Sequence, residues 1–161
     1  MKVKIKDIEK NINYKIKKNF KSIGIDTAQT TGIVILTSDE ETLKIEHLAL
    51  GFKTKNKKEI YYTMVKTFER IIEEDQFAVI EEVFVGFSRA GSVELAKYGS
   101  FAIAECIKKD IPYETISAVS ARSKFKINTR GHGKGKSKEA VSEWIQNNIG
   151  IEFVDNNLSD G

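Results

Sequence analysis

Hydrophobic and polar positions in the first third of the chain predict three short strands that follow one another closely. Apolar residues fill or alternate through three runs, at about 22–28, 31–38 and 43–50. Turn-forming residues separate these runs, around Gly32 and around Asp39. Strands joined by such short turns pair in antiparallel fashion, so the pattern predicts a three-stranded meander.

From residue 57 onward the pattern changes to alternating helices and strands. Apolar residues recur at helical spacing over 57–74, whereas 77–85 is an almost continuous apolar run, typical of a buried parallel strand. The other predicted elements are a long helix over 89–109, a strand over 113–119, a short helix from Ser120, a helix over 137–148 and a short strand over 151–154. Together they predict an α/β domain with a mixed five-stranded sheet, three antiparallel meander strands and then parallel strands, flanked by helices.

The composition is that of a soluble globular protein with one domain. Of the 161 residues, 40% are hydrophobic and 30% are charged. The single cysteine, Cys106, excludes an intramolecular disulfide and a cysteine-cluster metal site, and we expect it to be a small core residue. Because no apolar run could span a membrane and no signal-peptide core is present, we expect a soluble, cytoplasmic protein with no membrane partner. The abundance of Lys, Ile and Asn leaves a phage or virus origin open.

Positive charge is concentrated in two stretches, although the net charge is only +3. Residues 1–21 contain eight lysines against Asp7 and Glu9, and a second basic stretch runs from Arg130 to Lys138. Such patches indicate a polyanionic partner, nucleic acid before membrane, unless the lysines only solvate the surface. We treat 1–21, which could be helix or strand, as a basic extension preceding a domain of residues 22–161. Its role is left open among three alternatives: a strand added to the sheet, an arm that grips DNA, or a disordered tail.

Acidic residues interrupt two of the apolar runs. Asp26 ends the first strand, where it either caps the turn or binds a cation that offsets the cost of a carboxylate among apolar residues. Glu81 and Glu82 are adjacent in a strand, so they face opposite sides. In a mixed sheet the first strand and the strand after the first helix are often neighbours, which predicts that Asp26 lies near Glu81. With Asp160 near the end of the chain, these acids favour Mg²⁺ or Mn²⁺, and a pair of such ions can activate water for phosphodiester cleavage.

A glycine-rich basic loop over 128–136 precedes the last predicted helix. Glycines let a backbone approach phosphates closely, so we expect DNA contacts from the loop cations and the helix start: Arg130, Lys134, Lys136 and Lys138. His132 in this loop is more simply an ordinary loop residue. The alternative is a disordered basic surface loop.

The long helix over 88–109 is apolar on nearly all sides in its second half. One side can pack on the sheet and the other on a second copy, with Gly99 and Ala102 permitting close approach, so we expect a homodimer through this helix. Burial inside one domain is the alternative. At its start, Ser88 and Arg89 could contact phosphates and Phe87 could wedge between bases.

Three motifs in order resemble RuvC-type Holliday junction resolvases. They are Gly24-Ile25-Asp26 with Thr31-Gly32, then Val79-Ile80-Glu81-Glu82-Val83-Phe84-Val85, and Ser137-Lys138-Glu139-Ala140-Val141 before an Asp-ending tail. The resemblance runs from about residue 22 to the end and implies an RNase H-like fold, a homodimer, and Mg²⁺-dependent symmetric nicking of four-way DNA junctions. Carried over, Asp26, Glu81 and Asp160 are metal-binding carboxylates, Lys138 contacts the scissile phosphate or the junction, and Lys124 is the basic residue before the loop.

Two departures from the family pattern stand near the end of the chain. The family's fourth acid is replaced by Asn157, whose amide oxygen can ligate a metal without charge, and Asp155 is an alternative ligand. The chain also stops one residue after Asp160, where the family continues into a helix, so we expect the domain to lack its last helix.

Two other functions fit parts of the sequence. A junction-binding protein with lost or weak cleavage fits Asn157 and the short tail. An actin- or hexokinase-like ATP-binding fragment fits the strand, Asp26, turn and Thr31-Gly32, but 161 residues cannot hold the two lobes and second phosphate loop of that class.

Overall fold

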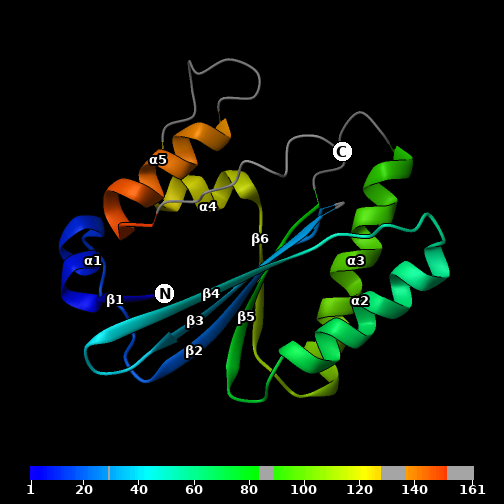
Figure 1. Cartoon of the computed structure of the whole chain (residues 1–161), viewed down its shortest axis with the longest axis horizontal. Helices are drawn as coiled ribbons and strands as arrows, with labels where there is room; N and C mark the ends of the chain where they lie inside the picture. Colours follow the sequence, from blue (N-terminus) through cyan, green and yellow to red (C-terminus); the bar gives the residue numbers. More distant parts are fainter. Residues whose placement is uncertain (29, 84–88, 128–136, 152–161) are drawn as a thin grey trace.

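A computed structural model describes the chain at residues 1–28, 30–83, 89–127 and 137–151. The elements in order are β1 (Lys2–Lys4), α1 (Ile5–Ile12), β2 (Phe20–Asp26), β3 (Thr31–Ser38), β4 (Thr42–Leu50), α2 (Lys57–Ile71), β5 (Gln76–Glu81), α3 (Arg89–Lys108), β6 (Tyr113–Ile116), α4 (Ala118–Lys124) and α5 (Ser137–Ile149). Helices α2 and α3 cover one face of the sheet, and α1, α4 and α5 lie on the other (Figure 1). No helix among the described residues is both long and apolar enough to cross a membrane.

The sheet is mixed, in the order β1-β4-β3-β2-β5-β6. Strands β2, β3 and β4 form the predicted antiparallel meander, and β5 and β6 add in parallel to β2 and to β5 respectively. The mixed α/β architecture is confirmed. Because β5 follows a helical crossover and lies directly beside β2, the carboxyl ends of these two strands meet at the same edge of the sheet.

The sheet has six described strands where five were expected, because the basic extension contributes one. Strand β1 pairs in antiparallel fashion with the edge strand β4, with Val3 opposite Leu43. Backbone hydrogen bonds from Ile45 to Met1 (2.8 Å) and from Ile5 to Glu41 (2.8 Å) continue this pairing at both ends. An exposed strand edge offers unpaired backbone groups, and here the start of the chain satisfies them.

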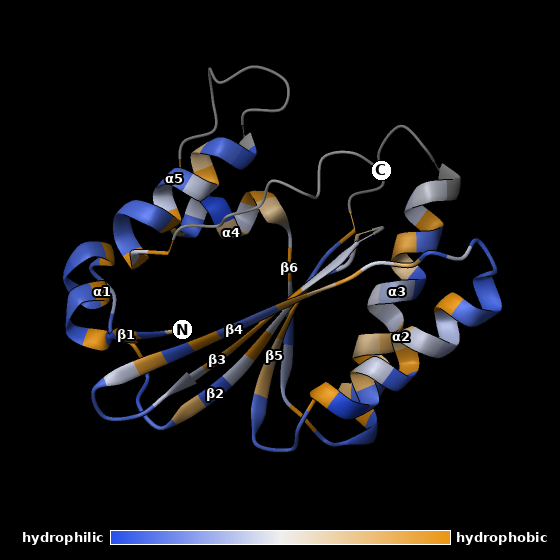
Figure 2. Cartoon of the chain, in the orientation of Figure 1, coloured by the Kyte–Doolittle hydropathy of each residue, from blue (hydrophilic) through white to orange (hydrophobic). Residues whose placement is uncertain are grey.

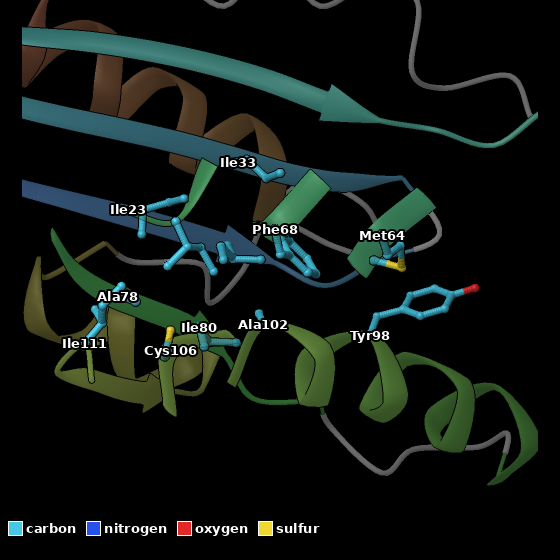
Figure 3. Packing of buried hydrophobic residues seen from close by; sticks show 12 residues of the cluster. Ile23, Ile33, Met64, Phe68, Ala78, Ile80, Tyr98, Ala102, Cys106 and Ile111 are labelled. Atoms are coloured by element: carbon cyan, nitrogen blue, oxygen red, sulfur yellow. The ribbon is translucent and has the colours of Figure 1, made fainter. Parts of the chain in front are cut away.

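The main core lies between the sheet and helices α2 and α3. Figure 3 shows side chains from both layers meeting there, and Phe68 and Met64 of α2 are fully buried against the strands. Cys106 of α3 is buried among them as a small core residue, as expected. Figure 2 shows hydrophobic residues interspersed with polar ones along α2, the helix that the spacing of apolar residues predicted.

A second, smaller cluster fills part of the other face. Ile5 and Ile8 of α1 are buried against Leu43 and Ile45 of β4. Partly buried residues from other elements pack around these four: Val3, Ile12, Ile16, Val34, Leu36, Ile149 and Ile151. The extension is therefore a packed part of the fold through residue 16, with its isoleucines at helical spacing turned toward the sheet.

Several predicted boundaries shift for local reasons. Helix α2 ends at Ile71 because Ile72 turns to extended backbone and is fully buried. Strand β6 ends at Ile116 because the Ser117 side chain accepts a hydrogen bond from the Ser120 amide (3.1 Å) and so caps α4. Strand β5 ends at Glu81, which puts this acid at a strand end and not in the middle of a strand as expected. Most of the strand predicted over 151–154 lies outside the described residues.

The predicted close approach of a second copy at Gly99 and Ala102 is wrong. Ala102 is fully buried in the main core, and a Cβ on Gly99 would lie 3.8 Å from the hydroxyl oxygen of Thr27. Both residues therefore face the sheet of their own chain. Small residues there allow α3 to approach the strand end that carries the first acid.

Candidate metal centre

Asp26 and Glu81 are the last residues of two adjacent parallel strands. In the register of β2 and β5, Ile25 lies opposite Ile80, and Asp26 and Glu81 follow. The apolar residues before each acid are buried in the sheet, which fixes both strands up to the edge. The two acids lie together, as the sequence predicted, because the crossover through α2 returns the chain beside β2.

The electrostatics of this pair are unusual for two carboxyl groups near a surface. The pKa of Glu81 is raised to about 7, mainly by burial and also by a hydrogen bond with the Asp26 carboxylate and by the charge of that carboxylate. Two carboxyl groups this close cannot both ionise at low cost without a nearby cation. The site therefore holds a proton between its acids at neutral pH, or a positive ion in the place of that proton.

Arg122 of α4 supplies part of the missing positive charge. Among the residues that the structure describes, it is the one cation whose charge lowers the pKa of Glu81, opposing the effect of burial, and it lines the same groove as both acids. Sequence reasoning missed it and favoured Lys124 on the same helix. A signal was present: α4 starts two residues after β6, so its side chains lie at the sheet edge where the acids end.

Glu82 points elsewhere. Its carboxylate accepts a hydrogen bond from the Thr115 hydroxyl of β6 (2.9 Å), and its amide donates to the Ile116 carbonyl (2.9 Å). This agrees with the expectation that adjacent strand residues face opposite sides. Glu82 is thus tied to the neighbouring strand, and Glu81 is the acid that faces Asp26.

A groove of about 1180 Å³ runs from the acid pair along the sheet face beneath α4 and α5. Asp26, Glu81, Arg122 and Lys138 are among the residues that line it, together with Lys17, Glu139, several serines and apolar residues of α1, α4 and α5. Lys138, in the first turn of α5, is exposed. The groove thus has acids and cations in its lining, a composition suited to a cation and an anionic group together.

The remaining predicted residues divide into two groups. Lys124 is exposed and pairs with Glu114 (3.5 Å), so it lies on the outer surface near the groove. Arg89 is the first residue of α3, although only its backbone is described. The others lie outside the described residues: Phe87, Ser88, Arg130, His132, Lys134, Lys136, Asp155, Asn157 and Asp160.

The donor set at the pair suits a hard divalent cation. It consists of carboxylate oxygens, with one acid made difficult to ionise by burial and by its neighbour. Within the described part of the chain, no group of three or more Asp, Glu, His or Cys side chains forms a metal site. Two protein carboxylates leave further coordination positions for water and phosphate oxygens, which is how Mg²⁺ is commonly bound.

Known structures share this fold. RuvC of Thermus thermophilus in complex with a Holliday junction substrate aligns with a TM-score of 0.55 and 12% identity, over 82% of this chain and 80% of that chain. A second Thermus thermophilus RuvC structure aligns with a TM-score of 0.52 and 14% identity, over 82% and 81%. No protein-family model matches the chain, and no curated protein matches it in sequence. The chain therefore has a RuvC-like fold.

Proposed function

We propose that this protein is a Mg²⁺-dependent endonuclease that resolves four-way DNA junctions by symmetric nicking, with Mn²⁺ able to substitute. The observation that carries the proposal is the hydrogen-bonded pair of Asp26 and Glu81 at the ends of two parallel strands, next to Arg122, in a RuvC-like fold. The two carboxyl groups favour a bound cation, and the cations that line the groove can bind a phosphate. A metal-dependent nuclease needs both of these features.

In this proposal Asp26 and Glu81 hold the metal, together with Asp160 and Asn157 from the tail. Bound Mg²⁺ supplies an activated water at neutral pH and neutralises charge on the scissile phosphate. Asp26 and Glu81 fix the ion at the sheet edge because their strands are anchored by buried residues. Glu81 must lose its proton to bind the ion, and its raised pKa makes that loss depend on pH near neutrality.

The cations of the groove bind and orient the DNA backbone. Arg122 presents a planar guanidinium that can donate two hydrogen bonds to one phosphate. Lys138 and Lys124 add point charges on either side, and the basic loop with Arg130, Lys134 and Lys136 extends the same function. Phe87, Ser88 and Arg89 are proposed contacts at the start of α3.

A second copy is proposed to dock on the outer side of α3. Val93 and Ile107 expose 52% and 65% of their surfaces, and Ala96 and Ser100 are exposed between them. Ile103 continues the row at intervals of three and four residues and is partly buried against the main core. This is the spacing of a seam between two helices, and a two-fold axis would pair the stripe with itself. Two symmetric copies place two metal centres on one symmetric junction.

The test is cleavage of a labelled four-way junction with Mg²⁺, Mn²⁺ or EDTA. Paired nicks that require metal and are lost in Glu81→Gln support the proposal, with Glu82→Gln as the matched control. Binding to the junction without metal-dependent nicks would instead indicate a junction-binding protein, the second candidate favoured by Asn157. ATP turnover in the absence of DNA would contradict both.

A further inference from the structure

The segment between α1 and β2 carries three lysines within four residues and is docked against the helix that holds Arg122. Residues 13–19 contain Lys15, Lys17 and Lys18 and no acid. The Tyr14 hydroxyl donates to the Lys124 carbonyl at the end of α4 (3.2 Å), and the Tyr14 ring meets the Phe125 ring edge-on at 6.1 Å. Phe125 in turn contacts Trp144 of α5 (5.2 Å).

Further contacts fix the segment along its length. The Ile16 amide donates to the Glu9 carboxylate (2.9 Å), and the Ser38 hydroxyl donates to the Lys17 carbonyl (2.6 Å). Asn11, near the end of α1, donates to the Asn148 carbonyl of α5 (3.0 Å). The backbone is thus held by α1, by β3 and by α4 together. Its lysine side chains project from a preordered surface and not from a free tail.

We propose that Lys15, Lys17, Lys18, Lys124 and Lys126 form one surface, here called the arm surface, that binds the phosphate backbone of a duplex DNA arm leading away from the metal centre. The Tyr14 contact joins the segment to the C-terminal end of α4, the helix that carries Lys124 and, two residues earlier, Arg122, which lines the groove with the acid pair. Figure 1 shows α1 and α4 on the same side of the sheet. The inference rests on the proposed function in taking duplex DNA as the partner.

The lysines of the arm surface are charged and exposed in a way that suits contacts to phosphates more than structural ion pairs. Lys15 pairs with Glu9 although 91% of its side chain is exposed, and Lys18 pairs with Glu40 at 3.4 Å. Such exposed pairs contribute little to stability and exchange readily for a phosphate. Lys17 lies over the Phe20 ring at 4.1 Å, and within the described residues no carboxylate forms an ion pair with Lys17 or Lys126. The arm surface therefore keeps net positive charge after its own pairs are counted.

The test is the salt dependence of DNA binding in EDTA, with a labelled four-way junction and a linear duplex. The test variant is Lys15→Gln/Lys17→Gln/Lys18→Gln, and the control is Lys57→Gln/Lys66→Gln/Lys108→Gln. The control removes the same number of positive charges and also breaks exposed ion pairs, but its lysines lie on α2 and α3, on the other face of the sheet. We expect the test variant to bind DNA about tenfold more weakly than the wild type. Its plot of log binding constant against log salt concentration should have a slope shallower by about 2 to 3, whereas the control should have the affinity and slope of the wild type. The Lys→Arg version of the test variant should restore binding.

An unchanged slope in the test variant, with its thermal melting transition intact, would overturn the arm surface. So would an equal loss in both variants. These outcomes can be distinguished from failure of the proposed function. If the wild type binds the junction but never nicks it, the nuclease proposal is wrong, and the slope comparison still tests the arm surface. If the wild type nicks the junction but the test variant shows no change of slope, only the arm-surface proposal is wrong.

Discussion

Glu81 shares a hydrogen bond with Asp26 across two parallel strands, and the pKa of Glu81 at this position is raised to about 7. Burial of Glu81 is the largest cause, followed by the bond to Asp26. A partly buried acid next to another acid is costly to ionise unless a cation is bound, which makes the pair a candidate metal site.

The first prediction concerns metal binding and pH. Because the folded-state pKa of Glu81 lies above its ordinary value of 4.5, the stability it contributes in metal-free protein is complete below about pH 4.5 and is lost as the pH rises through about 7. Mg²⁺ replaces the proton, so it should raise the melting temperature more at about pH 8 than at about pH 5.5. Differential scanning fluorimetry with Mg²⁺ or EDTA at both pH values measures this. The Glu81→Gln variant should show neither the pH dependence nor the difference, and an equal Mg²⁺ effect at both pH values would contradict the assignment.

The second prediction concerns Arg122. Removing its charge in Arg122→Gln should raise the pKa of Glu81 further, which moves the acidic limb of the nicking rate to higher pH. The rate at neutral pH should fall by about 10²-fold, because a preorganised donor to the phosphate is lost. Arg122→Lys should keep the position of the acidic limb. Lys124→Gln on the same helix serves as the control, and it should change the salt dependence of binding without moving the pH profile.

The third prediction concerns assembly. Ile107→Asp places a charge at the C-terminal end of the exposed stripe on α3, so the protein should become monomeric at micromolar concentration in light scattering. Val119→Asp, at an apolar position of α4 that is 73% exposed, is the control and should leave the mass unchanged. A wild type that is already monomeric, or an Ile107→Asp protein of unchanged mass, would exclude this interface.

The fourth prediction concerns how the extension is attached. The buried Ser38 hydroxyl donates to the Lys17 carbonyl (2.6 Å) and accepts from the Phe20 amide (3.1 Å). Ser38→Ala leaves both backbone groups without this partner, which should cost about 1–3 kcal/mol in urea unfolding. Ser120→Ala, at an exposed position of α4, should cost less than about 1 kcal/mol. A Ser38→Ala protein as stable as the wild type would contradict the docking of this segment.

Much of the fold could be predicted from the sequence because its strands have strong local signals. The meander strands are separated by turn residues, and the apolar run over 77–85 predicted a buried strand, which the structure ends at Glu81. The proximity of Asp26 to Glu81 followed from the crossover between them. By contrast, β1 has three residues, Lys2–Lys4, with no apolar pattern of its own, and its pairing depends on the free edge of β4.

The candidate site was only partly predictable, because side-chain direction depends on packing. Gly99 and Ala102 were expected to face a second copy, yet α3 turns them toward the sheet. An apolar helix surface does not reveal which side meets the core. The start of α4 two residues after β6 indicated that this helix lies at the sheet edge, but which of its side chains faces Glu81 depends on the angle at which α4 leaves β6, so Arg122 was missed in favour of Lys124.

The most direct test of the central claim is nicking of a four-way junction by three variants side by side. With Mg²⁺, the wild type and Glu82→Gln should nick the junction in symmetric pairs, whereas Asp26→Asn and Glu81→Gln should lose at least about 10²-fold in rate while still binding the junction in EDTA. Glu82 is the right comparison because it is the adjacent glutamate and its carboxylate is turned to Thr115. Nicking by Glu81→Gln at the rate of the wild type would contradict the account.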